Sequence, residues 1–284
     1  MRTMIAGSRY RCGMTSADRV RTFRDLHAAG TFVIPNPWDV GSARLLEQLG
    51  FPALATTSSG LAWSLGRSDN TVPIEAVLAH LHAVAGAVSV PVNADFEGGF
   101  AVEPTEVAAN VAAAATTGIA GLSIEDSTGD PNEPLHDLLL AVERIRAARR
   151  SIDESGTGIL LTGRSEGFIV GRPDLAATIR RLVAYAEAGA ECLYAPGIRT
   201  DEEVSAVVAA VAPRPVNVLV GSGFTTIADL ARLGVRRISV GGALARTAWA
   251  GFIDAATEIA ESGTFTRLAA VPGETLVVRF AEDR

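Results

Sequence analysis

The amino-acid sequence predicts an α/β protein folded as one (β/α)₈ TIM barrel, and two observations support this fold class. Short runs rich in β-branched residues alternate with longer Ala- and Leu-rich stretches of helical periodicity, and this alternation continues through eight units. No Pro- or Ser-rich linker and no block of like charge divides the 284 residues, and barrels of roughly 250 residues form one domain. Such an uninterrupted series favours a closed parallel barrel. An open doubly wound sheet is the alternative, but no Gly-x-Gly-x-x-Gly motif follows the first predicted strand.

Each predicted strand is a short apolar run that ends in small or polar residues. The predicted strands are residues 32–35, 53–58, 90–96, 121–126, 158–164, 192–196, 216–220 and 237–241. The predicted helices are residues 41–49, 74–86, 105–117, 137–150, 174–188, 202–210, 226–233 and 243–261. Glycines just past helix ends mark several of these boundaries, namely Gly50, Gly118, Gly189 and Gly234. We expect residues 1–14 to be a disordered extension and residues 15–284 to form a single barrel domain with a C-terminal helix and tail.

Composition excludes several classes of partner. The formal net charge is −7 and the isoelectric point is about 5.2, which argues against binding to nucleic acid or to an acidic membrane surface. No apolar run reaches the roughly 18–20 residues that span a bilayer, and the N-terminal residues do not resemble a secretory signal. Two cysteines, Cys12 and Cys192, are too few for a disulfide framework, and Cys192 is expected in the core. A cytoplasmic location is therefore expected.

The absence of lysine is the most selective feature of the composition. All 25 basic residues are arginine. Schiff-base aldolases, pyridoxal phosphate enzymes and Walker-type phosphate loops each need a lysine amine. The chain therefore belongs to none of these classes.

Acidic residues collect at the ends of neighbouring predicted strands, where barrel enzymes place their active sites. The third strand leads into Asp95 and Glu97, the fourth ends with Glu125 and Asp126, and Arg164 ends the fifth. Carboxylates brought together in this way are costly without a cation or ligand to satisfy them. Hard oxygen ligands without nearby His or Cys select Mg²⁺ or Mn²⁺. The sequence therefore predicts a Mg²⁺ or Mn²⁺ site at this end of the barrel.

Two further features favour a small anionic ligand beside that metal. Arg164 offers a planar fork suited to a carboxylate, and the amides and hydroxyls of residues 58–61 could hold an oxyanion. Each motif alone also has a structural explanation: a solvated turn, a helix cap, an ion pair or a loop. Their joint occurrence at the correct ends of consecutive strands favours a functional site.

With these residues in view, the chain resembles the isocitrate lyase/phosphoenolpyruvate mutase superfamily from about residue 23 to about residue 259. The resemblance is carried by these segments in order: Pro35-Asn36-Pro37-Trp38-Asp39, Ser58-Ser59-Gly60-Leu61, Asp95-Phe96-Glu97-Gly98-Gly99-Phe100, Ile124-Glu125-Asp126-Ser127, Gly163-Arg164-Ser165-Glu166 and Glu187-Ala188-Gly189-Ala190. Each segment is short, but their number and order make a specific signal.

The resemblance implies roles for individual residues. Asp95 would bind Mg²⁺ (or Mn²⁺) directly, and Glu97 and Glu125 would hold its water shell. The candidate substrate-binding residues are Trp38, Ser58, Ser59, Gly60, Leu61, Arg164 and Asn217. The candidate catalytic residues are Arg164, which would stabilise developing charge, Asp69, in the family's acidic position near the metal, and Glu166, the nearest further group for proton transfer. The family also implies a homo-oligomer, a tetramer or dimer, with a swapped or protruding C-terminal helix over residues 243–261.

The chain departs from the family in the loop after the fourth strand. Isocitrate and methylisocitrate lyases carry a Lys-Lys/Arg-Cys-Gly-His sequence there, and phosphonate mutases need a lysine and an asparagine. Here the loop reads Ser127-Thr128-Gly129-Asp130-Pro131-Asn132-Glu133-Pro134, without Lys, Cys or His. Both of these activities are therefore in doubt, although Asn132 could supply the asparagine.

Three functional hypotheses follow from the residues and the resemblance. The leading one is a Mg²⁺-dependent lyase that cleaves a C–C bond of a small 2-oxo or 2-hydroxy dicarboxylate, by retro-aldol cleavage or decarboxylation, through an enolate. The second is P–C bond chemistry, as a mutase or hydrolase, on a phosphonopyruvate-like substrate. The third is a metabolite-binding protein that has lost the chemistry of the loop.

Overall fold

The protein is an eight-stranded parallel barrel in the computed structural model, which describes residues 14–268 and 273. The strands pair in the order β1-β8-β7-β6-β5-β4-β3-β2. They are β1 (Phe32–Ile34), β2 (Leu54–Ala55), β3 (Val92–Asp95), β4 (Gly121–Glu125), β5 (Leu160–Arg164), β6 (Cys192–Tyr194), β7 (Val216–Leu219) and β8 (Arg237–Ser239). The two edges meet where the Ala55 amide donates to the Pro35 carbonyl at 3.1 Å. The (β/α)₈ prediction is confirmed.

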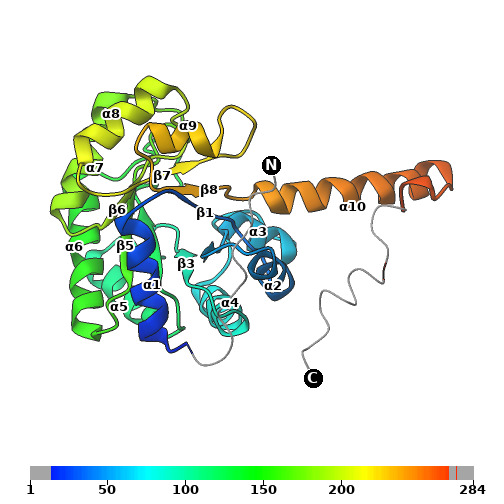
Figure 1. Cartoon of the computed structure of the whole chain (residues 1–284), viewed down its shortest axis with the longest axis horizontal. Coiled ribbons are helices and arrows are strands. Elements are labelled where there is room, and N and C mark those ends of the chain that lie inside the picture. The colour runs from blue at the N-terminus through cyan, green and yellow to red at the C-terminus, as the bar shows by residue number, and fades with distance from the viewer. Residues whose placement is uncertain (1–13, 269–272, 274–284) are drawn as a thin grey trace.

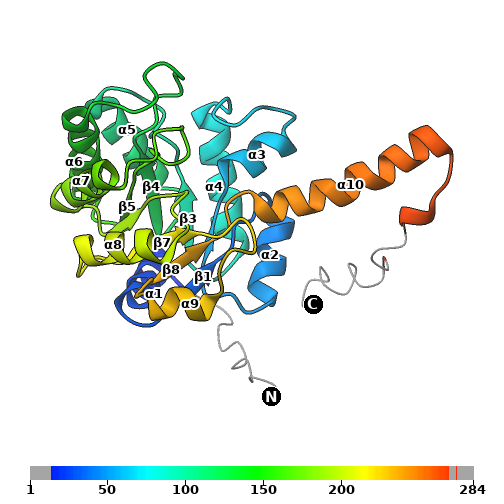
Figure 2. The same cartoon turned by 90° about the horizontal axis from the view of Figure 1, so that it is seen from above.

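Helices surround the strands (Figure 1, and from above in Figure 2). They are α1 (Ser16–Ala28), α2 (Val40–Gln48), α3 (Ser58–Ser64), α4 (Ile74–Ala87), α5 (Pro104–Ala115), α6 (Leu138–Ser155), α7 (Leu175–Glu187), α8 (Asp201–Val211), α9 (Ile227–Arg232) and α10 (Ala243–Ser262), followed by the 3₁₀ turn Thr266–Leu268. Within the described part of the chain, no helix is long and apolar enough to cross a membrane. The expectations for residues 1–13 and for the tail over residues 269–272 and 274–284 lie outside the described residues.

Local sequence signals explain where these helices begin and end. The Thr200 hydroxyl caps α8 by accepting from the Glu203 amide, and the Glu203 carboxylate bonds back to the cap. All four predicted helix-stop glycines adopt a positive φ, as a left-handed helix terminus requires. Predicted helix boundaries agree with the structure within a few residues, except that α6 runs on to Ser155.

The prediction was wrong at the end of the second strand. It extended that strand to residue 58, whereas β2 ends at Ala55 and α3 begins at Ser58. The Thr57 side chain accepts from the Gly60 amide at 3.4 Å and caps the new helix. Consecutive Thr and Ser residues favour such a helix N-terminus over a strand.

The N-terminal end of the barrel is closed by α1. Phe23 is fully buried, and its ring lies so close to Gly121 at the start of β4 that a side chain there would collide with it. His27, also buried, contacts Arg237 at the start of β8. The barrel interior is therefore sealed at this end and open at the other.

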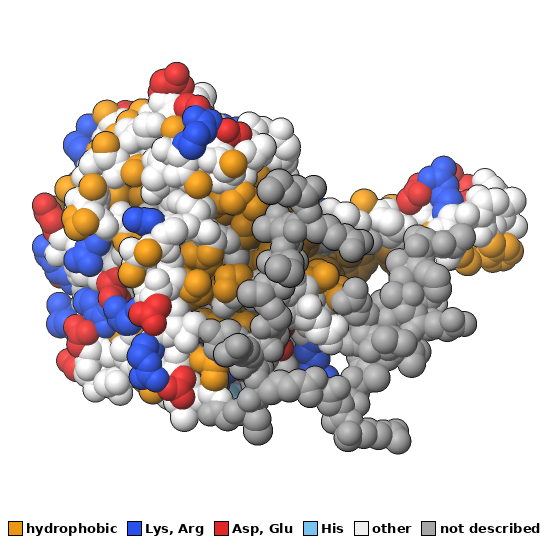
Figure 3. Space-filling view, viewed as in Figure 1, with side chains coloured by type: hydrophobic (Ala, Val, Ile, Leu, Met, Phe, Trp, Pro, Cys, Tyr) orange, Lys and Arg blue, Asp and Glu red, His pale blue; other side chains and the backbone are white. Residues whose placement is uncertain are grey.

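The last helix, α10, extends away from the barrel (Figures 1 and 2). Within it only Ala245 is buried, while Phe252, Ile253 and Ile259 are exposed. Figure 3 shows apolar side chains along α10 and on the barrel face beside its base. The expectation of a protruding C-terminal helix agrees with this arrangement.

Candidate active site

A small polar cavity occupies the open end of the barrel. Its volume is about 140 Å³, below the roughly 300–1,000 Å³ of pockets for drug-sized ligands. Its polar lining residues are Asn36, Thr56, Thr57, Ser58, Ser59, Asp69, Asn93, Asp95, Ser123, Arg164, Tyr194, Asn217, Arg237 and Ser239. A cavity of this size and polarity suits a compact, charged molecule with few heavy atoms.

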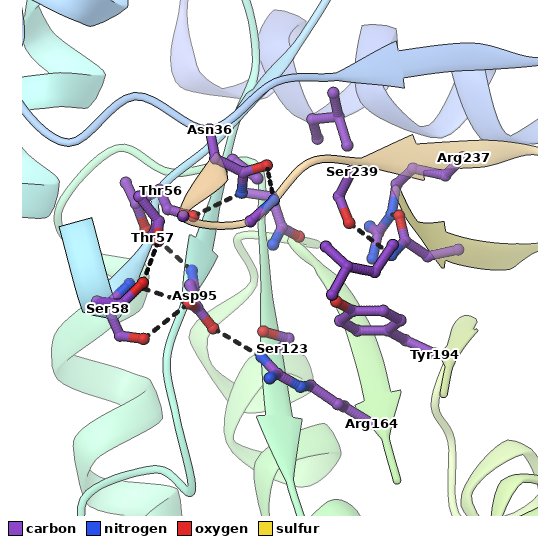
Figure 4. A pocket seen from close by; sticks show the side chains of 18 of the residues that line it. Asn36, Thr56, Thr57, Ser58, Asp95, Ser123, Arg164, Tyr194, Arg237 and Ser239 are labelled. Atoms are coloured by element: carbon purple, nitrogen blue, oxygen red, sulfur yellow. Dashed lines mark hydrogen bonds and ion pairs between the residues drawn. The ribbon is translucent and has the colours of Figure 1, made fainter. Parts of the chain in front are cut away.

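Asp95, the last residue of β3, is held firmly at the cavity wall (Figure 4). One carboxylate oxygen accepts from the amide and the hydroxyl of Ser58, both at 3.0 Å. The other oxygen lies 3.2 Å from the Arg164 guanidinium. The Asp95 amide donates to the Thr56 hydroxyl at 3.0 Å. The start of α3 and the end of β5 therefore fix the orientation of this carboxylate.

Arg164, at the end of β5, faces three carboxylates at once. It lies 3.2 Å from Asp95 and 3.3 Å from Glu125, and it forms a short hydrogen bond with Glu166. Its guanidinium also lies over the Tyr194 ring, 5.1 Å from the centroid. Burial alone would lower the pKa of Arg164, but Glu166 and Glu125 raise it well above its usual value. Arg164 is therefore a permanent cation.

The carboxylates around Arg164 are incompletely neutralised. Burial, together with repulsion from Asp95 and Asp69, raises the pKa of Glu97 to about 8. Burial also raises the pKa values of Glu125, Glu166 and Asp69, and neighbouring carboxylates raise them further. One guanidinium cannot compensate this much negative charge in a low-dielectric site.

The backbone that presents Glu97 has an unusual conformation. Glu97 has φ +46° and Phe100 has φ +57°, in a backbone region that residues other than Gly rarely occupy. The buried Arg144 of α6 holds this loop by donating to the carbonyls of Gly98 and Ala101, and to that of Glu125 at the end of β4. A helix on the outside of the barrel thus fixes the loop that carries Glu97.

Glu125 and Asp126 are adjacent in sequence but face opposite sides of the sheet, as strand alternation dictates. Glu125 turns toward Arg164. The Asp126 carboxylate instead accepts from Arg181, from the Tyr185 hydroxyl at 2.6 Å and from the Glu166 amide. Asp126 therefore anchors α7 and the end of β5, and it lies outside the cavity.

The structure brings half of the predicted site residues to the cavity wall. Those that line it are Ser58, Ser59, Asp69, Asp95, Arg164 and Asn217. An outer group of carboxyls, Glu97, Glu125 and Glu166, does not line the cavity. Glu125 and Glu166 pair with Arg164, and Glu97 interacts electrostatically with Asp95 and Arg164. Trp38, Gly60 and Leu61 do not reach the wall. A side chain on Gly60 would collide with Trp38, so this group supports α3 from behind.

Several residues that line the cavity were absent from the predicted site, notably Asn36, Tyr194, Arg237 and Ser239. Asn36 connects three strand ends, because it donates to the Thr56 carbonyl and accepts from the amides of Val240 and Gly241. Arg237 and Ser239 stand two apart on one strand. Polar pairs two apart mark the inward face of a barrel strand, and this period-2 signal could have found them.

The donor set fits a hard divalent cation. In residues 14–268 and 273, no three His, Cys, Asp or Glu side chains already converge as metal ligands. Mg²⁺, however, usually takes one or two carboxylates and keeps several waters. The Asp95 carboxylate at the cavity wall and the nearby Glu97 carboxyl, which accepts no hydrogen bond from the described residues, are oxygen donors of the kind that Mg²⁺ takes. The raised pKa values show that ionising these carboxyls is costly in this site, and a bound cation would relieve that cost.

The fold and the position of the site define a (β/α)₈-barrel protein whose chemistry lies at the carboxyl ends of its strands. The sequence profile of the phosphoenolpyruvate phosphomutase family matches residues 23–260, and the chain belongs to this family. The family lies within a superfamily of lyases and mutases.

Three proteins illustrate what this chain is similar to. A crystal structure of a provisionally assigned lyase/mutase from Burkholderia cenocepacia has 47% sequence identity and a TM-score of 0.91, covering 94% of this chain and 98% of that one. An uncharacterized protein of Mycobacterium tuberculosis is 35% identical over 222 residues, 78% of this chain and 81% of that protein. The oxaloacetate decarboxylase of Bradyrhizobium diazoefficiens is 31% identical over 188 residues, 61% of each chain.

Proposed function

We propose that this protein is a Mg²⁺-dependent lyase that cleaves a C–C bond of a small 2-oxo or 2-hydroxy dicarboxylate, by retro-aldol cleavage or decarboxylation. The observation that carries the proposal is Asp95, fixed by Ser58 and Arg164 at the wall of a small polar cavity and surrounded by under-neutralised carboxylates. Mn²⁺ would satisfy the same ligands. The similarity to an oxaloacetate decarboxylase supports the choice of C–C over P–C chemistry, as does the absence of lysine.

Asp95 would hold the cation directly, and Glu97 and Glu125 would hold its water shell. When bound, the cation supplies Lewis-acid stabilisation of negative charge on a 2-oxo oxygen. Arg164 contributes a second fixed positive charge on the same side of the cavity. Because the Arg164 guanidinium is held by Glu125 and Glu166, it needs no reorganisation as the substrate's charge develops.

Substrate binding follows from the rest of the cavity wall. The Ser58 and Ser59 hydroxyls, which line the cavity, would receive a substrate carboxylate near Asp95, with Ser58 giving up its side-chain hydrogen bond to Asp95. Asn217 stands deeper in the barrel, 1% exposed, where the far end of the ligand would lie. The volume of about 140 Å³ favours a compact dicarboxylate over a larger acid.

The test is metal-dependent product formation from oxaloacetate and a panel of alkyl-substituted malates and citrates, with phosphonopyruvate as the P–C substrate. We expect a 2-oxo acid only with Mg²⁺ or Mn²⁺, and a loss of at least about 10²-fold in Asp95→Ala. Asp25→Ala, an exposed change on α1, is the matched control and should retain full activity. Turnover of phosphonopyruvate alone would replace the lyase assignment, and metal-dependent binding without any turnover would support a binding protein.

We further propose that the protein is a homo-oligomer, a dimer or tetramer, in which α10 packs on another subunit. The support is the exposed apolar side chains Phe252, Ile253 and Ile259 on a helix that leaves its own barrel. Light scattering should give a mass of at least two chains, and Phe252→Asp with Ile253→Asp should yield monomers. The cytoplasmic location stays a prediction.

A further inference from the structure

A second arginine, Arg237 at the start of β8, lines the wall of the cavity away from the acidic residues. Its side chain is 3% exposed. Figure 4 shows Arg237 and Ser239 on one side of the cavity, and Ser58 and Asp95 on the other. The cavity therefore has a carboxylate on one side and a buried guanidinium on the other.

The hydrogen-bond partners of Arg237 are all neutral groups. The Arg237 Nε donates to the Asn217 Oδ1 at 2.9 Å, and Nη2 donates to the Thr162 hydroxyl at 3.1 Å. Nη1 lies 3.4 Å from the His27 Nε2. An arginine carries five N–H donors, and these contacts use three of them. The other two N–H groups have no acceptor among the described residues.

His27 does not offset the charge of Arg237. The His27 Nδ1 lies 2.7 Å from the Phe23 carbonyl, so it carries the ring proton that this carbonyl accepts. The Nε2 then has a free lone pair, which accepts from Arg237. Burial and the nearby charge of Arg237 together lower the pKa of His27 to about 3. His27 is therefore neutral at pH 7.

Arg164 is the contrasting cation of the same cavity. It faces the carboxylates of Asp95, Glu125 and Glu166. No carboxylate of the described residues pairs with Arg237, although an arginine keeps its charge when it is buried. Because burial of an unpaired charge is costly, Arg237 has an unmet need for an anion, and it borders the cavity through which one can enter.

The position of Arg237 suits the far end of a short ligand. Its partner Thr162 lies two residues before Arg164 on β5, and side chains two apart on a strand point to the same face. Two residues of a strand span roughly 7 Å. Since Arg164 is paired with Asp95, the Asp95 end and the Arg237 end of the cavity are separated by the length of a short carbon chain.

We propose that Arg237 binds the second carboxylate of the substrate and thereby selects dicarboxylates over monocarboxylates. This inference rests on the proposed function, in which the cation on Asp95 binds the 2-oxo or 2-hydroxy acid end. Asn217 is a positioning residue, because its Oδ1 holds the guanidinium and its Nδ2 donates to the Ser239 hydroxyl at 2.9 Å. A ligand that ends in a methyl group would leave Arg237 unpaired.

The first test is calorimetric titration of malate and of 2-hydroxybutanoate in the presence of Mg²⁺. The two acids share the 2-hydroxy acid end and the chain length, and only malate has a second carboxylate. The wild type should bind malate at least about 30-fold more tightly, as expected for a buried charge that gains its partner. Arg237→Met should abolish this preference and leave the binding of oxalate, which has no chain to reach Arg237, largely unchanged.

The matched control is Arg236→Met, which removes the same charge from the neighbouring residue. Arg236 is not part of the cavity wall and donates to the Gly30 carbonyl, so this variant should keep the preference for malate. Equal wild-type affinities for the two acids, or a preference that survives in Arg237→Met, would overturn the inference. Failure of the wild type to bind oxalate with Mg²⁺ would refute the proposed function instead.

A second variant keeps Arg237 and supplies the missing negative charge. Asn217→Asp puts a carboxylate oxygen where the Asn217 Oδ1 now accepts from Arg237. The melting temperature should rise in the absence of metal and ligand, and the preference for malate should be lost while oxalate still binds with Mg²⁺. A lower melting temperature would contradict an unpaired charge on Arg237. A purely structural Arg237 would leave the preference for malate in place, and that result would also overturn the inference.

Discussion

Arg144 connects the stability of the barrel to the shape of the site, and its replacement gives a quantitative prediction. The side chain is 1% exposed. It donates to the Glu125 carbonyl at 3.2 Å, to the Ala101 carbonyl at 2.9 Å and, by a short bond, to the Gly98 carbonyl. Arg144→Met keeps a long apolar stem but removes every donor.

The expected cost follows from these three acceptors. Each buried carbonyl that loses its donor costs about 1–3 kcal/mol, and the loss of a buried charge offsets part of that sum. We therefore expect the free energy of unfolding to fall by about 3–5 kcal/mol, a large share of the roughly 5–15 kcal/mol typical of a folded protein. The loop that carries Glu97 would also lose its anchor, so Mg²⁺-dependent oxalate binding should weaken.

Urea denaturation followed by circular dichroism measures the change. The matched control is Arg146→Met on the same helix, whose side chain is 49% exposed and pairs with Glu143. An exposed pair of this kind contributes about 1 kcal/mol or less. If Arg144→Met cost no more than Arg146→Met, the anchoring role given to Arg144 would be refuted.

Three further changes test other parts of the structure. Burial and the nearby charge of Arg237 together lower the pKa of His27 to about 3. Between about pH 6.5 and pH 3 the unfolded state therefore holds one more proton than the folded state. The free energy of unfolding should fall by about 1.4 kcal/mol per pH unit as the pH drops through that window. His27→Gln should remove this part of the slope in urea titrations, and an unchanged slope would count against it. Gly60→Ala should lower the free energy of unfolding by about 1–3 kcal/mol, because the new methyl group would collide with Trp38. Gly86→Ala, which has open space around it on α4, should raise it by about 0.5–1 kcal/mol. Equal effects of the two changes would contradict the close contact between Gly60 and Trp38. Thr200→Ala should lower the melting temperature through the loss of the α8 cap, a cost of about 0.5–2 kcal/mol, and no change would argue against that capping box.

The fold could be predicted from sequence because its signals are local. Apolar runs, helical periodicity and helix-stop glycines each act over a few residues, and their eightfold order leaves few topologies. The predicted end of the second strand was wrong because a local signal was overlooked: the Thr and Ser residues that follow Ala55 begin a helix. The exact paths of the strand ends depend on hydrogen bonds between distant residues, such as that from Asn36 to the Thr56 carbonyl. A short stretch of sequence does not reveal such bonds.

The candidate site was predictable where charged residues stood at strand ends, as Asp95 and Arg164 do. The resemblance to the superfamily supplied further lining residues, namely Ser58, Ser59, Asp69 and Asn217. Tyr194 and Arg237 were missed because an aromatic or a lone arginine inside an apolar strand reads as core or surface. Their importance comes from closure of the barrel, which brings β5, β6, β7 and β8 around one cavity.

Calorimetric titration of oxalate, with and without Mg²⁺, into the wild type and Asp95→Ala tests the central claim most directly. The account predicts binding to the wild type only when Mg²⁺ is present, and none to Asp95→Ala under either condition. Oxalate binding that is equally strong without a divalent cation, or that survives in Asp95→Ala, would contradict a metal site built on Asp95.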